Sequence, residues 1–457
     1  MRKQISEKEL FEYAPVPKSV AVLAIPTIIS QLVTMVYNLA DTFFIGQIGN
    51  PYMVAAVSLV FPWFNLLTAL GNLFGLGASS LISRMLGTKD YDDIKHVSSF
   101  SIWGGAFTVF CFSVLSYLFR KPLLVFLGAS QDTYHYAESY LLWVVVLGGV
   151  PTMVSLVLAH LLRSEGHTKQ ASAGMMFGGI MNMVLDPLFI FVFDLDVMGA
   201  AIATMFSNSL ALLFFAYSYG KLKSHSNVSL DPRNFTFGFM RQIFSVGLAS
   251  ALATTLANAS NMVIMKLASG YGDIAIAACG IVKKIDQLPI NISMGLCQGV
   301  MPLIGYNYAS GDYKRMHRVS TFSWKVASIM SLCFVSLFCI FSPFILRVFI
   351  KDSQTSVLGS AFLRIASLSV PLTSINFLVS YTFQAMGKGL ESATLTFSRQ
   401  GILNIPLLIL MNIIFGLYGM IWTQLVVEVL MLPVSLFMYF HVLRKLQRKS
   451  SAVADKS

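Results

Sequence analysis

Two acidic residues lie inside long apolar stretches of this chain, and the first is Asp41. The residues over 20–40 carry no charge, and the apolar run continues beyond the acid over 43–45. Tyr37 and Asn38 precede Asp41 by four and three residues, so they share its helix face. An acid at that depth is costly in lipid, and we expect it to face a bundle interior or a wet cavity and to accept a proton or a cation. The alternative is an acid at a helix end that reaches the far membrane interface.

The second acid, Asp186, belongs to a polar set in two later stretches. In GGIMNMVLDPLFIFVF, Asn182 precedes Asp186 by four residues on the same face, and Pro187 frees a backbone carbonyl. The stretch GAAIATMFSNSL places Thr204 and Asn208 on one face. If these stretches meet the first, two carboxylates, an amide and a hydroxyl converge. Such oxygens suit Na⁺, and paired acids equally suit proton exchange.

Each polar residue of this set also has a purely structural interpretation. Asn182 and Thr204 could form hydrogen bonds between helices, which are common in membranes. Asp186 could be an interfacial acid, because Asp194 and Asp196 follow it closely.

The elements that position these residues must be membrane helices. The chain has 457 residues, of which 56% are hydrophobic and only 12% charged, whereas a soluble protein is roughly one quarter charged. The composition predicts an all-α polytopic membrane protein. Pro26 interrupts the backbone hydrogen bonds of the first stretch, so we expect a hinge there. The five cysteines have no metal-ligand spacing and are expected to be small apolar residues.

We count twelve apolar stretches long enough to cross a bilayer. They are 19–45, 53–83, 97–119, 134–162, 170–193, 198–220, 239–267, 274–306, 319–342, 357–385, 392–415 and 418–442.

The net charge of +11 is a topology signal in such a protein rather than a sign of nucleic-acid binding. With the N-terminus inside, the inner loops and the tail hold most of the basic residues: Arg84, Lys89, Lys95, Arg163, Lys169, Lys221, Lys223, Arg233, Arg241, Lys314, Arg315, Arg318, Lys388, Arg444, Lys445, Arg448, Lys449 and Lys456. The outer loops hold only Arg120, Lys121, Lys266, Arg347 and Lys351. Both termini are therefore expected in the cytoplasm.

The chain repeats itself once. The segment 90–101 matches 312–323 through Asp-Tyr, Val-Ser and Phe-Ser at identical spacing. Further pairs keep the same order: Gly77 with Gly299, Leu81 with Leu303, Ile82 with Ile304, Pro122 with Pro343, Pro151 with Pro371, Gly166 with Gly387 and Gly199 with Gly419. Six spans per copy predict two six-helix bundles related by a pseudo-two-fold axis along the membrane normal. The expected domains are an N-terminal bundle over 1–220, a cytoplasmic linker over 221–238, and a C-terminal bundle with a basic tail over 239–457.

These features together resemble one transporter family over nearly all of the chain. The residues that carry the resemblance are Pro26, Asp41, Asn182, Asp186, Pro187 and Thr204, within duplicated six-helix halves. They are similar to the multidrug and toxic compound extrusion (MATE) family, and to its DinF-like branch in particular. The resemblance implies that Asp41, Asn182, Asp186 and Thr204 form a cation site and that Pro26 bends the first helix. It also implies efflux of cationic, amphipathic drugs in exchange for H⁺ or Na⁺, with the four site residues as metal ligands only if the ion is Na⁺.

The C-terminal half departs from another branch of that family, which has an acid in the seventh span and another in the tenth. Asn258 and Asn261 stand in the seventh span here, and the tenth has no acid. Its own polar cluster comprises Lys283, Asp286, Arg399 and Glu428. We expect Asp286 to pair with Lys283 or Arg399 and Glu428 to be ion-paired too, as a structural strut. A second proton relay or a cation-repelling gate is the functional alternative.

Several function classes lack their motifs. No phosphate-binding G-x-x-x-x-G-K-[ST], zinc-binding H-E-x-x-H or nucleophile G-x-S-x-G is present, so we expect neither ATP-driven transport nor an enzyme. No cofactor is expected beyond the transported ion. The alternative function is a flippase for lipid-linked oligosaccharides, and a channel is a further rival. We expect a monomer in the inner (plasma) membrane of a bacterial cell, with small-molecule drugs and the bilayer as partners and no nucleic acid.

Overall fold

The computed structural model describes residues 9–222, 226–350 and 352–454, and the regular structure in those ranges is helical throughout. Lys223, Lys351 and Lys456 lie outside the described residues, and the side chain of Lys449 is likewise not described. The first half contains the π-helical segment η1 (Glu9–Tyr13), α1 (Val16–Gln47), α2 (Pro51–Thr88), α3 (Tyr91–Ser99), η2 (Phe100–Gly104), α4 (Gly105–Leu118), α5 (Arg120–Phe126), α6 (Gln131–Leu141), η3 (Leu142–Leu147), α7 (Gly149–Ser164), α8 (Thr168–Pro187), η4 (Leu188–Val192) and α9 (Asp196–Leu222). The second half contains η5 (Pro232–Asn234), α10 (Met240–Ser269), α11 (Asp273–Ala309), α12 (Tyr313–Phe349), α13 (Ser353–Ser367), α14 (Val370–Ala385), α15 (Gly389–Thr396), η6 (Phe397–Asn404) and α16 (Ile405–Ala454).

The number of membrane crossings follows from helix length. Among the described residues, nine helical stretches are long and apolar enough to cross, and two bent helix pairs raise the number to eleven. The last stretch, Gly389–Arg448, has 60 residues, whereas one crossing needs ~20. Gly416 divides it, because its φ of 62° and ψ of −146° are not helical. Counted as two, this stretch gives twelve crossings, which confirms the predicted fold class.

Two compact units hold these crossings; five lie wholly within each unit, and α1 and α10 are divided between the two. One unit comprises Ile29–Ala251, and the other comprises Met1–Ile28 together with Leu252–Ser457. The division points fall inside α1 and α10, because the first turns of each helix pack within the unit that does not contain its later turns. The predicted division of the chain into lobes at the 221–238 linker remains a proposal.

Two glycines that correspond in the sequence repeat explain why the first turns of α1 and α10 pack within the unit that does not contain their later turns. In the Ile29–Ala251 unit, a Cβ atom on Gly77 of α2 would lie 2.3 Å from the carbonyl oxygen of Ile243, at the start of α10. In the other unit, a Cβ atom on Gly299 of α11 would lie 2.6 Å from the Cα of Ala24, near the start of α1. Only glycine permits such backbone approach. Gly77 and Gly299 are a pair in the sequence repeat, so the two halves use the same contact.

The bends of the two halves also correspond. The segment Gln131–Leu147 meets Gly149–Ser164 at 46°, and Ser353–Ser367 meets Val370–Ala385 at 44°. Pro151 and Pro371, another predicted pair, stand just after these breaks. Each proline lacks the N–H that would continue the hydrogen-bond ladder across the break.

Most of the predicted linker is a strap on the Ile29–Ala251 unit. The buried carboxylate of Glu165 accepts hydrogen bonds from the Ser226 hydroxyl and from the Asn227 backbone N–H, the latter at 2.7 Å. Further along the strap, Ser99 donates to the Asp231 carbonyl at 2.9 Å. These bonds hold the described residues from Ser226 onward against α3 and the end of α7.

The η1 segment is anchored to α12 within the unit that comprises Met1–Ile28 and Leu252–Ser457, here called the second unit. The Arg315 guanidinium donates to the carbonyl of Phe11 at 2.9 Å and to that of Ala14 at 2.7 Å. The ring of Phe11 stacks on Tyr306, with ring centres 5.1 Å apart, and Tyr306 also bonds Glu12. A guanidinium bonded to several carbonyls fixes the backbone of η1 before α1 begins.

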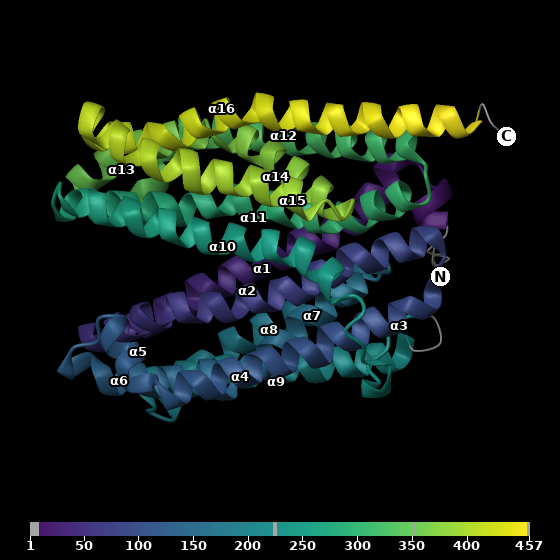
Figure 1. Ribbon diagram of the computed structural model, residues 1–457. Helices are drawn as coiled ribbons and strands as arrows, with labels where there is room; N and C mark the ends of the chain where they lie inside the picture. Colours follow the sequence, from purple (N-terminus) through teal and green to yellow (C-terminus); the bar gives the residue numbers. More distant parts are fainter. Residues whose placement is uncertain (1–8, 223–225, 351, 455–457) are drawn as a thin grey trace. The chain divides into compact units, whose positions relative to one another are not determined.

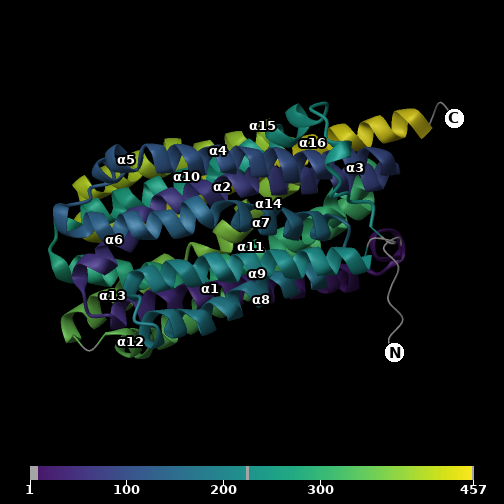
Figure 2. The ribbon, with the colours of Figure 1, turned by 90° about the horizontal axis from the view of Figure 1, so that it is seen from below.

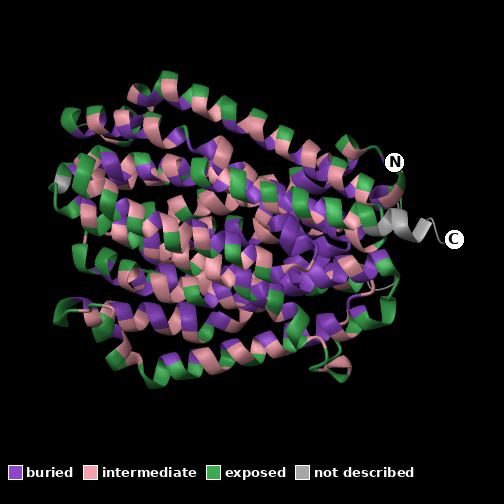
Figure 3. Cartoon of the chain, turned by 45° about the horizontal axis from the view of Figure 1, so that its top comes forward, coloured by how far each residue is buried: buried purple, intermediate pink, exposed green. Residues whose placement is uncertain are grey.

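The outer faces of the helices are apolar, as lipid contact requires. Figure 3 shows exposed and half-buried residues along helices throughout the chain. Many of the exposed residues are large and apolar, such as Phe107 on α4, 69% exposed, and Ile413 on α16, 74% exposed. Exposed apolar surface on this scale indicates a membrane environment.

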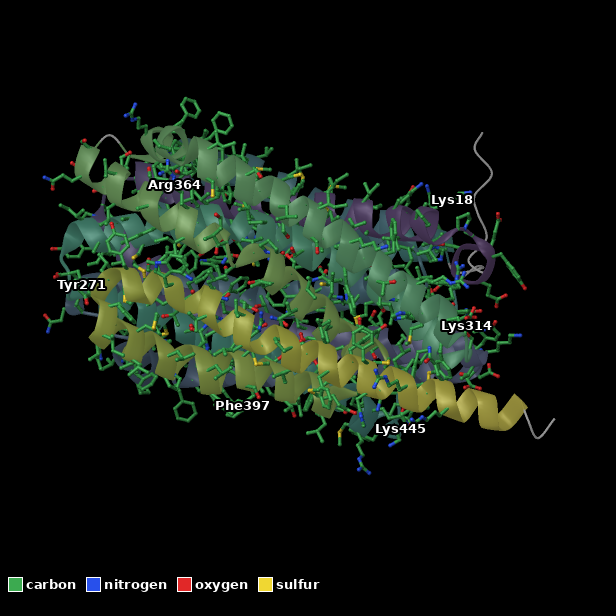
Figure 4. The ribbon with its side chains drawn as sticks, turned by 90° about the horizontal axis from the view of Figure 1, so that it is seen from above. Lys18, Tyr271, Lys314, Arg364, Phe397 and Lys445 are labelled. Atoms are coloured by element: carbon green, nitrogen blue, oxygen red, sulfur yellow. The ribbon has the colours of Figure 1, made fainter. Side chains whose placement is uncertain are left out.

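Labelled charged residues of the second unit lie near its ends. Figure 4 places Lys18, Lys314 and Lys445 toward one end of this unit and Arg364 toward the opposite end. The first three belong to the segments that we expect on the cytoplasmic side.

Candidate functional site

The site is built on the contact between α8 and α9, which run side by side in the Ile29–Ala251 unit (Figure 1 and Figure 2). Small residues allow this contact. A Cβ atom on Gly178 would lie 3.0 Å from the Cβ of Ala211, and one on Gly174 would lie 2.4 Å from the Phe215 ring. Small residues are the usual means of close helix packing in membranes.

Asn182 connects the polar residues of the two helices. Its side-chain amide donates to Oδ1 of Asp186 at 3.3 Å and lies 3.4 Å from Oγ1 of Thr204. Asp186 has no exposed surface, and Asn182 is 3% exposed. The structure therefore brings together three of the four predicted site residues through direct contacts.

Tyr37 links α1 to this cluster. Its ring lies against Gly179 of α8, where a Cβ atom would be 2.9 Å from Cδ1 of the tyrosine. Asp41 follows one turn later, and the charges of Asp41 and Asp186 are close enough to act on one another. The fourth predicted residue thus joins the other three.

Three oxygen atoms of this cluster have no donor. Oδ1 of Asp41, Oδ1 of Asn182 and Oδ2 of Asp186 are enclosed and lack a hydrogen-bond partner in the part of the chain that the structure describes. Buried polar atoms normally find partners, and enclosed carboxylate oxygens without one favour uptake of a proton or a cation. The described residues contain no group of three or more His, Cys, Asp or Glu side chains placed to hold a metal. Binding of Na⁺ here would therefore rely on the amide and hydroxyl oxygens as well.

Sequence reasoning missed one residue of this site, Tyr140. It lies at the end of α6, is 7% exposed, and is close enough to Asp41 and Asp186 for their charges to act on it. Tyr140 has no acid at a one-turn spacing in its own helix, so no local pattern indicated it. Only the packing of α6 against α2 and α9 places it beside the acids.

The other predicted residues of the first span lie at the edge of this site or away from it. Asn38 is exposed, and its backbone carbonyl accepts a hydrogen bond from Thr42 at 2.9 Å. Pro26 lies inside α1, two residues before the point where the helix passes from one compact unit to the other. A hinge at that point remains a prediction.

The C-terminal cluster corrects one expectation. Arg399 is paired with Glu428, Nη1 to Oε1 at 3.1 Å, and both are buried. Asp286 pairs with neither Arg399 nor Lys283 among the described contacts, and its Oδ1 has no hydrogen-bond partner there. The Arg399 guanidinium is paired with Glu428 instead, and Lys283 acts on Asp286 only through its charge, at longer range. The ion-paired strut is thus Arg399–Glu428 alone.

Comparison with known proteins identifies the class. A model of the MatE family matches residues 26–188 and 249–410, one match in each half of the chain. The chain belongs to the MatE family.

One relative by sequence is the multidrug export protein MepA of Staphylococcus aureus. It is 34% identical over 418 residues, which cover 92% of each chain. The same name is given to a protein of Staphylococcus saprophyticus with equal identity and coverage.

Solved structures of MATE proteins have the same fold as this chain. A crystal structure of a MATE protein in the straight conformation matches with a TM-score of 0.91 and 25% identity, and one in the bent conformation matches with 0.89 and 25%. Each alignment covers 98% of this chain and all of the other. The fold is that of a MATE transporter.

Proposed function

We propose that this protein is a secondary active multidrug exporter that moves cationic, amphipathic compounds out of a bacterial cell in exchange for H⁺ or Na⁺. The observation that carries the proposal is the set of three enclosed oxygens on Asp41, Asn182 and Asp186 that have no hydrogen-bond partner among the described residues. The names of the relatives, which are multidrug export proteins, supply the class of cargo.

We expect ion binding to act on α1 by changing the net charge of the Asp41–Asp186 cluster. Asp41 on α1 and Asp186 on α8 carry like charges that act on one another when both are ionised. A proton or a Na⁺ ion in the cluster removes that repulsion and lets α1 settle closer to α8. Tyr37, seated on Gly179, is the contact about which α1 would move.

Coupling to the drug follows from that movement. If the ion-bound arrangement of α1 has lower affinity for the drug, then ion binding expels the drug, and drug binding expels the ion by the same factor. Rocking of the two halves provides alternating access in such repeats. The bend at Pro26 is the proposed hinge of this motion, within a chain whose termini both lie in the cytoplasm.

The first test uses cells that lack their own exporters. Asp41→Asn and Asp186→Asn should each remove resistance to ethidium completely, while the protein remains in the membrane at its normal level. Asp194→Asn is the matched control, since Asp194 is exposed and lies eight residues beyond Asp186. Resistance retained by Asp41→Asn would refute the assignment.

The alternative function, a flippase for lipid-linked oligosaccharides, predicts a different pattern. Such cargo is anionic through its phosphates, and an acidic cluster of two carboxylates would repel it. The proposed transporter acts as a monomer and uses no cofactor besides the exchanged ion.

A further inference from the structure

Two buried acids in the second unit have opposite surroundings. Glu428 has no exposed surface, and its carboxylate accepts from Arg399 at 3.1 Å, Gln424 at 2.9 Å and Asn376 at 2.6 Å. The guanidinium of Arg399 also lies over the Phe377 ring at 4.4 Å. A carboxylate with three donors, one of them cationic, has its hydrogen-bonding needs met within the fold and serves as a structural pair.

Asp286 on α11 has none of these donors. It is 8% exposed, and its Oδ1 is fully enclosed without a partner in the described ranges. Lys283, one turn earlier, acts on it through charge but does not pair with it. An ionised carboxylate so placed is costly, and protonation relieves that cost.

A small cavity opens onto this carboxyl group. Asp286 and Lys283 line it together with the polar side chains of Asn404, Thr423 and Gln424, and the rest of its wall is mostly apolar. The cavity volume is about 30 Å³, and one buried water needs ~10–15 Å³ of such space. The cavity therefore suits one or two waters and is too small for a drug.

A chain of hydrogen bonds connects the polar lining of this cavity to the Arg399–Glu428 pair. Asn404 donates to Gln424 at 3.3 Å, and Gln424 donates to Glu428 at 2.9 Å. The titratable lining groups are Lys283, Cys279 and Asp286 itself, all on α11, while α10, α13, η6 and α16 contribute only neutral side chains. Glu428, at the end of this hydrogen-bond chain, is neutralised by its pairing with Arg399.

We propose that Asp286 is a second ion-exchange site, which binds one proton from cavity water and releases it once in each transport cycle. An O–H bond forms on the carboxylate as hydronium in the cavity becomes water, and the reverse step returns the proton. A metal cation is disfavoured, because Lys283 would repel it and only one carboxylate is present. The proposal rests on the proposed antiport, but not on which ion the cluster in the other unit binds.

Proton release on drug binding tests this directly. Purified full-length protein in weakly buffered detergent is mixed with tetraphenylphosphonium, and released protons are counted with a pH dye. Asp286→Asn should bind tetraphenylphosphonium yet release one proton fewer than the wild type. Its plot of log Kd against pH should lose about one unit of slope, as linkage requires.

Two variants serve as controls. Glu391→Gln removes a partly exposed carboxylate, paired with Lys388 at 3.1 Å, from the same unit and should release the wild-type number of protons. Asp286→Ser, which leaves room for an additional water, replaces Asp286→Asn if the latter does not fold. Equal release by the wild type and the Asp286 variant, or no release by the wild type, overturns the inference. The antiport proposal fails instead if Asp41→Asn still transports.

Discussion

Within the described part of the chain, Asp41 and Asp186 each keep one carboxylate oxygen without a donor, whereas Glu428 accepts three hydrogen bonds. On the proposed function, this contrast separates acids that exchange an ion from one that stabilises the fold. A fully bonded carboxylate gains nothing from a proton, while an unpartnered one in an enclosed site does.

Thr204→Val tests the role of the hydroxyl in the cluster. Valine keeps the shape but loses the oxygen that lies 3.4 Å from the Asn182 amide. Loss of one such hydrogen bond costs ~1 kcal/mol, so we expect about a fivefold increase in the ion concentration that half-saturates transport.

The matched control is Thr108→Val on α4. Its hydroxyl donates to the Gly104 carbonyl of its own helix at 2.8 Å, away from the acids. This variant should keep the wild-type ion dependence. An equal shift in both variants would mean that the Thr204 effect is a general loss of packing.

Residue spacing predicted part of this site and could not predict the rest. Asn182 and Asp186 lie four apart on one helix, so their contact follows from helix geometry. Tyr37 shares a face with Asp41 by its spacing in α1, but its contact with Gly179 of α8 is tertiary. Tyr140 reaches the acids from α6, and no local pattern encodes that packing. Asp286 was predicted to pair with Lys283 or Arg399, but in the folded chain Arg399 pairs with Glu428.

At the scale of single elements, the anchor of η1 explains how α1 begins. Arg315→Ala removes the bonds to the carbonyls of Phe11 and Ala14. Bonds to a charged donor contribute ~1.5–3 kcal/mol each, so we expect the segment before α1 to detach. Limited proteolysis should then cut near Tyr13 much faster than in the wild type.

The control for this experiment is Arg318→Ala, which removes an exposed arginine from the next turn of α12. It should leave the proteolysis rate unchanged. Equal cutting of the two variants would show that Arg315 does not hold the segment.

The close approach of α11 to α1 gives a second prediction at this scale. Gly299→Ala forces a Cβ atom to within 2.6 Å of the Ala24 backbone, so one helix must shift. We expect a loss of ~1–3 kcal/mol, the usual cost of overpacking, seen as a lower melting temperature in detergent. Gly280→Ala on the same helix meets nothing within 4 Å and should melt like the wild type or slightly above it.

Element boundaries were less predictable than element number. Long apolar stretches predicted the twelve crossings, because one crossing has a fixed length. The breaks before Pro151 and Pro371 were not predicted as bends, although both prolines marked the repeat. Whether a proline bends a helix depends on what packs around it, which the sequence alone does not state.

At the scale of the whole molecule, the repeat is reflected in more than sequence. Gly166 and Gly387, a predicted pair, both follow a bent span and both have positive φ, 87° and 74°. The two halves differ in their acids: Asp41 and Asp186 in one unit, Asp286 and the paired Glu428 in the other. A duplicated scaffold with unequal polar interiors allows each half to bind ions differently.

Transport of ethidium by purified protein in sealed vesicles, under a pH gradient alone, a Na⁺ gradient alone or no gradient, tests the central claim most directly. The account predicts that the wild type concentrates ethidium only when an opposing gradient of one of these ions is imposed, and that Asp41→Asn concentrates none under any condition. Accumulation without an ion gradient, or uphill accumulation by Asp41→Asn, would contradict it.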